Sequence, residues 1–164
     1  MDHPSPEGGG RPIREIYLEH AETLYRIAFT YLKNPYDSED ALQECFLRCL
    51  RSGKTFVDAQ HEKGWLIRTL VNICRDALRA RARGAESVDD HPELAAASPE
   101  GTLLDAVLAL PDRYKAPLYL YYYEGYSVKE IAAMLRLPAN TVKTRLSRAR
   151  KLLKNEWGDE PDEE

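Results

Sequence analysis

Cysteine is scarce in this chain, and long apolar runs are missing. The 164 residues contain three cysteines, Cys45, Cys49 and Cys74, all within apolar helical patterns, which argues against a disulfide framework and is typical of buried thiols. No apolar run approaches the roughly 20 residues that a membrane-spanning helix needs, and residues 1–12 lack the hydrophobic region of a signal peptide. We therefore expect a cytoplasmic protein that does not insert into a membrane.

Strand patterns are also missing. No segment of convincing length alternates apolar and polar residues, whereas apolar residues recur at helical spacing over most of the chain. The helices expected from this spacing are residues 13–33, a segment that begins at Asp37 or Ser38, and residues 65–83, 103–110 and 114–123. Residues 52–63 are expected to form a polar loop, and Pro117 is expected in the first turn of its helix, where a missing N–H is harmless. The predicted fold class is all-α.

Basic residues are absent from residues 85–112, which carry seven acidic ones, and residues 156–164 add six acidic residues without a basic one. The net charge of the whole chain is −4. Residues 127–155 have the opposite character, since eight Lys and Arg residues stand against one Glu, a net charge of +7. A local excess of this size is the electrostatic signature of a nucleic-acid-binding segment, although the total charge by itself argues against one.

Residue arrangements that carry catalysis are missing as well. The sequence contains no paired-carboxylate, nucleophile–base or phosphate-loop pattern, so a protein without enzymatic activity is expected. Cys45 and Cys49 are four residues apart and could share a metal ion, but none of the four histidines lies at a spacing that would complete the site. We therefore expect no metal and no cofactor.

The helical periodicity fails between residues 84 and 100, where acidic residues, Ala, Ser and two prolines dominate. This composition is typical of a flexible linker. It divides the chain into two small helical domains, residues 13–83 and residues 101–155. Residues 1–12 are expected to be a disordered N-terminus, and residues 156–164 an acidic tail.

Two short amphipathic patterns joined by a turn make Tyr126–Arg150 the most informative segment. Ser127 and Glu130 form the signature of a capping box at the start of the first pattern, and Pro138 follows its end. In the second pattern apolar residues recur at helical spacing while cations occupy the other positions. This combination is typical of a DNA-binding helix-turn-helix.

The polar face of the second pattern supplies the candidate DNA contacts. Early exposed residues of such a helix reach base edges, and its cations position the helix on phosphates. The candidates are Lys143, Thr144, Arg145, Ser147, Arg148, Arg150 and Lys151. The simpler interpretation, a solvated basic face on an ordinary helical domain, remains open at this point.

Two further polar faces lie in the first domain. The second expected helix carries Asp40, Gln43, Glu44 and Arg48 opposite its apolar face. The third carries a stripe of Arg68, Asn72, Arg75 and Arg79 at helical spacing, which would suit single-stranded nucleic acid. Either face could instead be solvated, with intrahelical pairs such as Glu44 and Arg48 four residues apart.

Taken in order, these motifs resemble the extracytoplasmic-function (ECF) class of RNA polymerase sigma factors, which have only regions 2 and 4. The resemblance spans roughly residues 13–154. In region 2 it rests on Leu24-Tyr25, Leu32, Asn34, Asp37-Ser-Glu-Asp40, Gln43-Glu44, Phe46-Leu-Arg48, Trp65-Leu66, Val71-Asn72 and Asp76. In region 4 it rests on Leu110-Pro111, Glu124-Gly125-Tyr-Ser127, Glu130-Ile-Ala132 and the run from Thr141 to Arg150.

The resemblance implies binding partners and a separate role for each of these helix faces. The polar face of the second helix would bind the β′ clamp helices of core RNA polymerase, with region 4 near the β flap. The stripe of the third helix would help to melt the −10 promoter element, and the loop before it would shape a pocket for an extruded base. The basic helix would read the −35 element of promoter DNA as duplex. An anti-sigma factor is the further partner that the family implies.

Two other functions remain open from the residues alone. The chain could be a helix-turn-helix transcriptional regulator that binds palindromic DNA as a homodimer, with the first domain as a sensor or dimerisation module. It could also be a protein-interaction adaptor whose basic helix is only a solvated face. Neither alternative requires the acidic-amide face of the second helix or the Arg/Asn stripe of the third.

Overall fold

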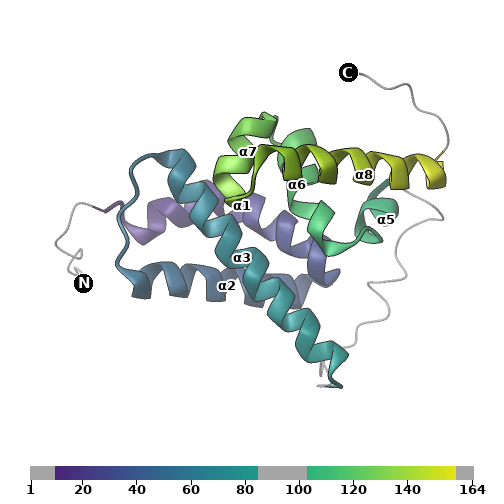
Figure 1. Cartoon of the computed structure of the whole chain (residues 1–164). Coiled ribbons are helices and arrows are strands. Elements are labelled where there is room, and N and C mark those ends of the chain that lie inside the picture. The colour runs from purple at the N-terminus through teal and green to yellow at the C-terminus, as the bar shows by residue number, and fades with distance from the viewer. Residues whose placement is uncertain (1–9, 85–102, 158–164) are drawn as a thin grey trace. The chain divides into compact units, whose positions relative to one another are not determined.

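The computed structural model describes residues 10–84 and 103–157, and these residues form helices and connecting turns without a strand (Figure 1). The predicted all-α fold is confirmed. The chain divides into two compact units, residues 1–87 and residues 88–164. Most of the predicted N-terminal segment, linker and acidic tail lie outside the described residues. Within the described ranges, no helix combines the length and apolar character needed to cross a bilayer.

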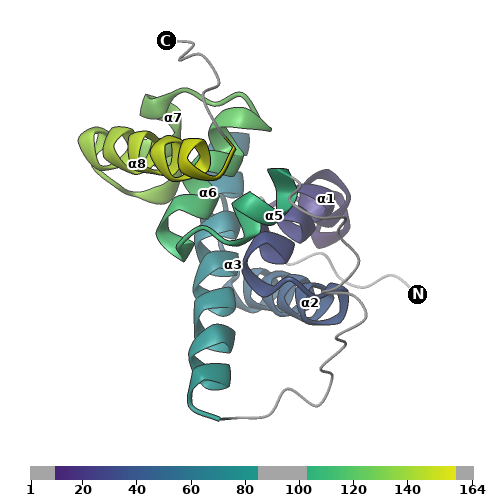
Figure 2. The same ribbon diagram turned by 90° about the vertical axis from the view of Figure 1, so that its right-hand side faces the viewer.

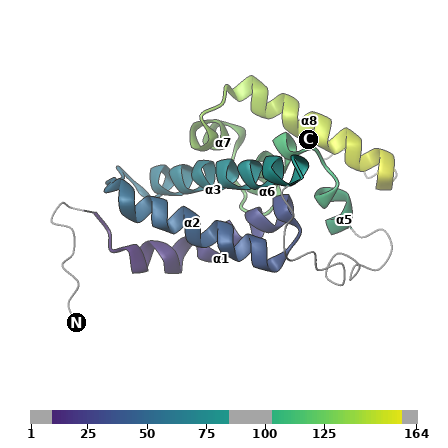
Figure 3. The ribbon, with the colours of Figure 1, turned by 90° about the horizontal axis from the view of Figure 1, so that it is seen from below.

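Three helices, α1 (Ile13–Leu32), α2 (Pro35–Ser52) and α3 (Ala59–Ala82), form the first unit and pack against one another pairwise. Figure 3 shows them side by side. Their apolar faces meet in a core that includes Leu24, Ile27, Cys45, Leu66, Leu70 and Cys74, each without exposed surface. All three cysteines are buried free thiols, as predicted.

Helix α2 begins earlier than predicted, at Pro35 instead of Asp37 or Ser38, because Asn34 is an effective N-cap. The Asn34 Oδ1 atom accepts hydrogen bonds from the backbone N–H groups of Tyr36 (2.8 Å) and Asp37 (3.1 Å). Pro35 occupies the first helical position, where its fixed φ suits the helix and its missing N–H costs nothing.

Helix α3 begins six residues before the predicted Trp65, at Ala59, so the expected loop of residues 52–63 is shorter than predicted. The side chain of Asp58 caps α3 by accepting a hydrogen bond from the backbone N–H of His61 at 2.7 Å. In this first turn Ala59 is small and the next three residues are polar, so no hydrophobic period marks it, which is why the turn escaped sequence analysis.

Polar contacts join the start of α2 to the end of α3. Arg81, near the end of α3, forms an ion pair with Asp37 in the first turn of α2. Its Nη1 atom also donates a hydrogen bond to the carbonyl oxygen of Leu32, the last residue of α1, at 3.4 Å. One arginine therefore links all three helices of the unit.

The second unit contains α5 (Leu103–Leu108), α6 (Asp112–Tyr122), α7 (Val128–Leu135) and α8 (Ala139–Trp157). Helix α8 packs against α5, α6 and α7, and Figure 2 shows it lying over α6 beside α7. The core includes Leu120, Ile131, Val142, Leu146 and Ala149, all with at most 2% of their surface exposed. The apolar pattern predicted for α8 is thus its buried face.

Helix α6 begins earlier than predicted, which places Pro117 outside its first turn. It begins at Asp112, directly after Pro111, so Pro117 is its sixth residue and lies beyond the first turn. The position leaves the carbonyl oxygen of Arg113 without its usual i, i+4 donor. The start was misplaced because Asp112 and Arg113 carry no apolar signal.

Candidate nucleic-acid interface

The turn between α7 and α8 sets the orientation of the basic helix. Ser127 caps α7 in the predicted capping box: its Oγ atom accepts from the Glu130 N–H at 3.1 Å, and the Glu130 carboxylate accepts from the Ser127 N–H at 3.2 Å. Arg136 ends α7 in the left-handed conformation, at φ 54°. Its backbone N–H then bonds to the carbonyl oxygen of Ala132, and the chain turns into α8.

One face of α8 gathers most of the predicted DNA contacts. Lys143, Thr144, Ser147, Arg148 and Lys151 line a single shallow depression, and all five are exposed. The Thr144 hydroxyl donates to the carbonyl oxygen of Asn140 at 2.8 Å, so its oxygen keeps the capacity to accept a hydrogen bond. Three cations around two hydroxyl groups make a surface suited to a nucleic-acid backbone and base edges.

The two other predicted residues of α8 lie outside this depression. Arg145 is half-buried. The Arg150 guanidinium packs on α6: its Nε atom donates to the Tyr122 hydroxyl at 2.6 Å, and the group lies over the rings of Tyr121 and Tyr122, 5.4 and 5.8 Å from their centroids. Arg150 therefore has an intramolecular structural role alongside any contact with DNA.

A cation that sequence analysis missed lies beside this surface, at the start of α6. The Arg113 Nη2 atom donates to the Tyr114 hydroxyl at 3.1 Å, and its guanidinium lies over the Tyr114 ring at 4.6 Å. The pKa of Tyr114 is lowered, first by the Arg113 hydrogen bond and then by the nearby Arg148 guanidinium of α8. Two guanidinium groups thus converge on one phenol oxygen, while the neighbouring Asp112 pairs with Lys115 at 3.3 Å.

The predicted stripe on α3 is present on one helical face. Asn72 and Arg79 are exposed, whereas Arg68 and Arg75 are half-buried. Arg79 also forms an ion pair with Asp76, 3.5 Å away on the same helix. Side chains of both charge signs therefore border the stripe, and its net positive character is weaker than the sequence suggested.

The polar face of α2 brings together the four predicted residues. Asp40, Gln43 and Arg48 are exposed, and the Arg48 Nε atom donates to the Glu44 carboxylate at 3.1 Å. Two large apolar side chains accompany them on α2: Leu47 is 42% exposed and Leu50 is 54% exposed. The face therefore offers both charged groups and apolar area to a partner.

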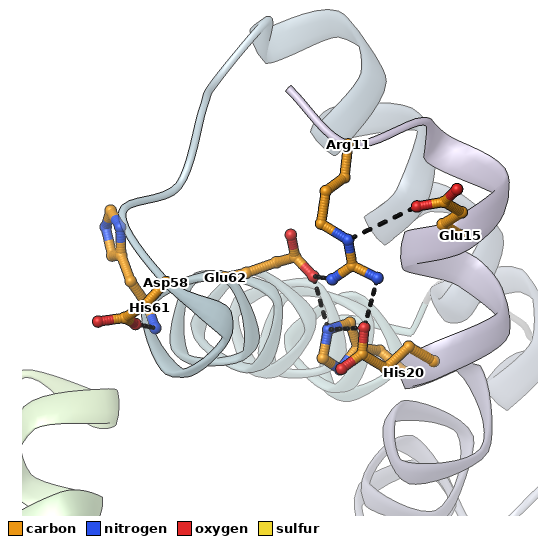
Figure 4. A network of polar contacts seen from close by, with 7 residues as sticks. Arg11, Glu15, His20, Asp58, His61 and Glu62 are labelled. Carbon is orange, nitrogen blue, oxygen red and sulfur yellow. Dashed lines mark hydrogen bonds and ion pairs between the residues drawn. The ribbon is translucent and has the colours of Figure 1, made fainter. Parts of the chain in front are cut away.

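One cluster of metal-ligating side chains occurs within the described residues, formed by Glu19, His20 and Glu62, whose ligand atoms lie within 4.8 Å of one another (Figure 4). The Arg11 guanidinium already contacts two of them, Glu62 at 2.7 Å and Glu19 at 2.5 Å. The pKa of Glu19 is lowered chiefly by its hydrogen bond from Arg11. The Arg11 guanidinium thus occupies the position beside these carboxylates that a metal ion would need.

Comparison with known proteins identifies the chain. The family model described as "Sigma-70 region 2" matches residues 16–84, and the model described as "Sigma-70, region 4" matches residues 100–153. The chain belongs to the sigma-70 family, in its ECF group. The first unit is therefore sigma region 2, built from α1, α2 and α3, and the second is region 4, built from α5 to α8.

Named relatives support the same assignment. RNA polymerase sigma factor SigV of Bacillus subtilis is 34% identical over 141 residues, covering 83% of this chain and 85% of that protein. ECF RNA polymerase sigma factor SigE of Mycolicibacterium smegmatis is 33% identical, covering 86% of this chain and 60% of that protein. The sigma factor RpoE of Bartonella quintana, solved with the anti-sigma factor NepR, shares the fold with a TM-score of 0.69 at 23% identity, over 90% of this chain and 98% of that one.

This sigma factor directs the initiation of transcription by RNA polymerase. The homodimeric regulator and the adaptor are not favoured, because sigma region 2 matches residues 16–84 and sigma region 4 matches residues 100–153.

Proposed function

We propose that this chain, as an alternative sigma factor, reads the −35 element with α8 and the −10 element with α3. The observation that carries the proposal is the shallow depression on α8, where three cations surround two hydroxyl-bearing residues. In a helix-turn-helix this face lies in the major groove, where an arginine bidentate to guanine contributes about 1–3 kcal/mol of discrimination. Arg148 is the residue we assign to that role, and Lys143 and Lys151 are assigned to phosphates.

For the −10 element we propose that the α3 stripe receives the displaced strand. Single-strand binding requires cations along the backbone track and planar or amide groups for the bases. The exposed Asn72 supplies an amide in the middle of the stripe, while Arg68, Arg75 and Arg79 supply guanidinium groups on either side of it.

Core polymerase is assigned to the polar face of α2. Asp40, Gln43, Glu44 and Arg48 would contact the β′ clamp helices, and region 4 would lie near the β flap. The exposed Leu47 and Leu50 support this assignment, because apolar area inside a polar rim is the usual composition of a reversible protein interface.

Two further points follow from the family. The chain supplies specificity and RNA synthesis belongs to the polymerase, so we propose that it has no catalytic activity and acts in the cytoplasm. We also propose an anti-sigma factor as a partner that masks the DNA- and polymerase-binding faces. The structural relative RpoE was solved with such a protein, NepR.

The experiment that tests the function is reconstitution of the full chain with bacterial core RNA polymerase. A stoichiometric complex that initiates transcripts at genomic sites sharing a two-part promoter is the expected result, and sequencing of those transcripts yields the promoter motif. Failure to form the complex, together with binding to palindromic DNA, would support the homodimeric regulator instead.

A further inference from the structure

A polar network joins Arg11, which precedes α1 and keeps 40% of its side chain exposed, to the buried Glu62 in the first turn of α3 (Figure 4). Glu62, in that turn, accepts a hydrogen bond from the Arg11 Nη1 atom at 2.7 Å, and the same carboxylate oxygen lies 2.8 Å from the His20 Nε2 atom of α1. Arg11 precedes α1 and also contacts Glu19 at 2.5 Å and Glu15 at 3.9 Å. One guanidinium therefore joins three carboxylates from two helices.

The burial of Glu62 makes Arg11 more than a surface ion-pair partner. Glu62 is 2% exposed and His20 is 3% exposed, so the carboxylate has lost nearly all contact with water. A buried carboxylate is tolerated only when charge and hydrogen bonds compensate it, and removing the partner leaves an uncompensated charge inside the protein. His20 links α1 to this turn directly, while Arg11 supplies the positive charge that compensates the buried Glu62 carboxylate.

The same turn carries the loop of residues 53–58 on its other side. Asp58 caps the turn through the His61 N–H, and the His61 Nδ1 atom accepts from the Val57 N–H at 3.2 Å. The Phe56 ring packs edge-on against the His61 ring, with centroids 5.4 Å apart. The side chain of His61 projects away from the Arg11 cluster (Figure 4). His61 thus anchors the loop of residues 53–58, and the adjacent Glu62 anchors the polar network with Arg11.

This loop exposes a large apolar side chain to solvent. Val57 is 89% exposed, the largest exposure among the large apolar side chains that the structure describes. The Phe56 ring next to it is half-buried and packs against Trp65 of α3, with centroids 5.8 Å apart, while Lys54 lies over the Trp65 ring at 5.9 Å. Apolar and aromatic groups next to a cation are the surface that an unstacked base requires.

We propose that Arg11 is a positioning residue for promoter opening, which acts through Glu62 to hold the 53–58 loop in the conformation that receives a displaced −10 base. The inference rests on the proposed function of the first unit. It assigns to the segment before α1 a role in melting DNA, and none in binding polymerase or reading duplex.

The test uses the holoenzyme of the full chain on a promoter identified by transcript sequencing. Arg11→Met keeps the length of the side chain and removes its charge and donors. Complex formation with polymerase and binding to the closed promoter are expected to equal those of wild type. The fraction of bound promoters whose −10 thymines react with permanganate is expected to fall severalfold, and Arg11→Lys should restore part of it.

The matched control is Arg26→Met on α1, which breaks an exposed pair with Glu22 at 2.6 Å and should leave opening unchanged. Glu62→Gln tests the same link from α3, keeps the shape of the side chain, and carries the test if Arg11→Met does not fold. Wild-type opening by either folded variant would overturn the inference. A wild-type chain that forms no polymerase complex would instead contradict the proposed function.

Discussion

Cys45 shows how burial dominates the chemistry of a single side chain. Its Sγ atom lies in the core of the first unit and donates to the carbonyl oxygen of Leu66 at 3.4 Å. Burial, with smaller contributions from Cys49 and Cys74, raises the pKa of the Cys45 thiol from 9.0 to about 12. Since the thiolate is the reactive form, the raised pKa keeps this thiol protonated at neutral pH, and we assign it a packing role.

The raised pKa of Cys45 predicts a pH dependence of stability. In the unfolded chain the thiol ionises near pH 9, while in the folded chain it stays protonated until about pH 12. Between these values the unfolded state binds fewer protons, so the free energy of unfolding should fall as pH rises, by at most about 1.4 kcal/mol per pH unit from this group. Urea unfolding of wild type and Cys45→Ala between pH 9.0 and about 12 measures the contribution of this thiol to the free energy of unfolding. Parallel pH profiles would contradict the prediction.

Arg113 is the single residue that most extends the predicted DNA surface. Its guanidinium shares the Tyr114 hydroxyl with Arg148, and it forms no ion pair within the described part of the chain. Because Arg148 is assigned to a base, the neighbouring Arg113 guanidinium is the one we assign to a backbone phosphate of the same DNA.

We therefore predict that Arg113→Gln lowers the salt dependence of promoter binding by the holoenzyme. Losing one phosphate contact should reduce the slope of log K against log salt by about 0.9. The control is Arg26→Gln, which removes the same charge from an exposed pair on α1. Equal slopes for Arg113→Gln and wild type would remove Arg113 from the interface.

Helix ends decide how each element presents its functional face. Helix α7 is only eight residues long, too short to be stable by itself, and its capping box satisfies two backbone groups at its start. Because α7 packs against α8, the cap also supports the basic helix.

Removal of this cap should have a measurable cost. Ser127→Ala is expected to lower the free energy of unfolding by about 1 kcal/mol, because the Glu130 N–H loses its acceptor. Ser127→Asn keeps an N-cap oxygen and should stay close to wild type. Urea unfolding followed by circular dichroism compares the three proteins, and an alanine variant as stable as the asparagine variant would show that the cap is dispensable.

Sequence analysis was accurate for the elements whose signal is local. The capping box, the end of α7 before Pro138 and the buried face of α8 all follow from short-range patterns. The starts of α2 and α3 were wrong, because an N-cap changes a helix boundary without changing the hydrophobic period.

Long-range polar contacts were beyond any pattern in the sequence. Arg11 and Glu62 are separated by 51 positions, and Arg113 approaches Arg148 only after α6 and α8 have packed. Arg150 looked equivalent to its neighbours on α8, and only the packed structure reveals its contact with Tyr122. Periodicity predicts which side of a helix faces the core, but it cannot predict which distant side chain covers a polar group.

At the scale of the whole molecule, each unit has its own core and its own functional faces, so binding to polymerase and reading of DNA should be separable by mutation. The α2 face includes the exposed Asp40 and the Glu44–Arg48 pair. Reversing both acidic charges, in Asp40→Lys with Glu44→Lys, places like charges beside Arg48 and against any basic partner.

The double variant is expected to fold with the helical content of wild type and to lose binding to core polymerase. Arg148→Ala should keep polymerase binding and lose about 1–3 kcal/mol of discrimination at one −35 base pair. Glu22→Lys, an exposed charge reversal on α1, is the control for net charge. Titration of fluorescent core polymerase measures the first effect and competition between promoter variants the second. Retained polymerase affinity in the double variant would remove α2 from the interface. Loss of polymerase binding in the double variant, with polymerase binding kept and −35 discrimination lost in Arg148→Ala, requires that the two units contribute distinct contacts to one initiation complex.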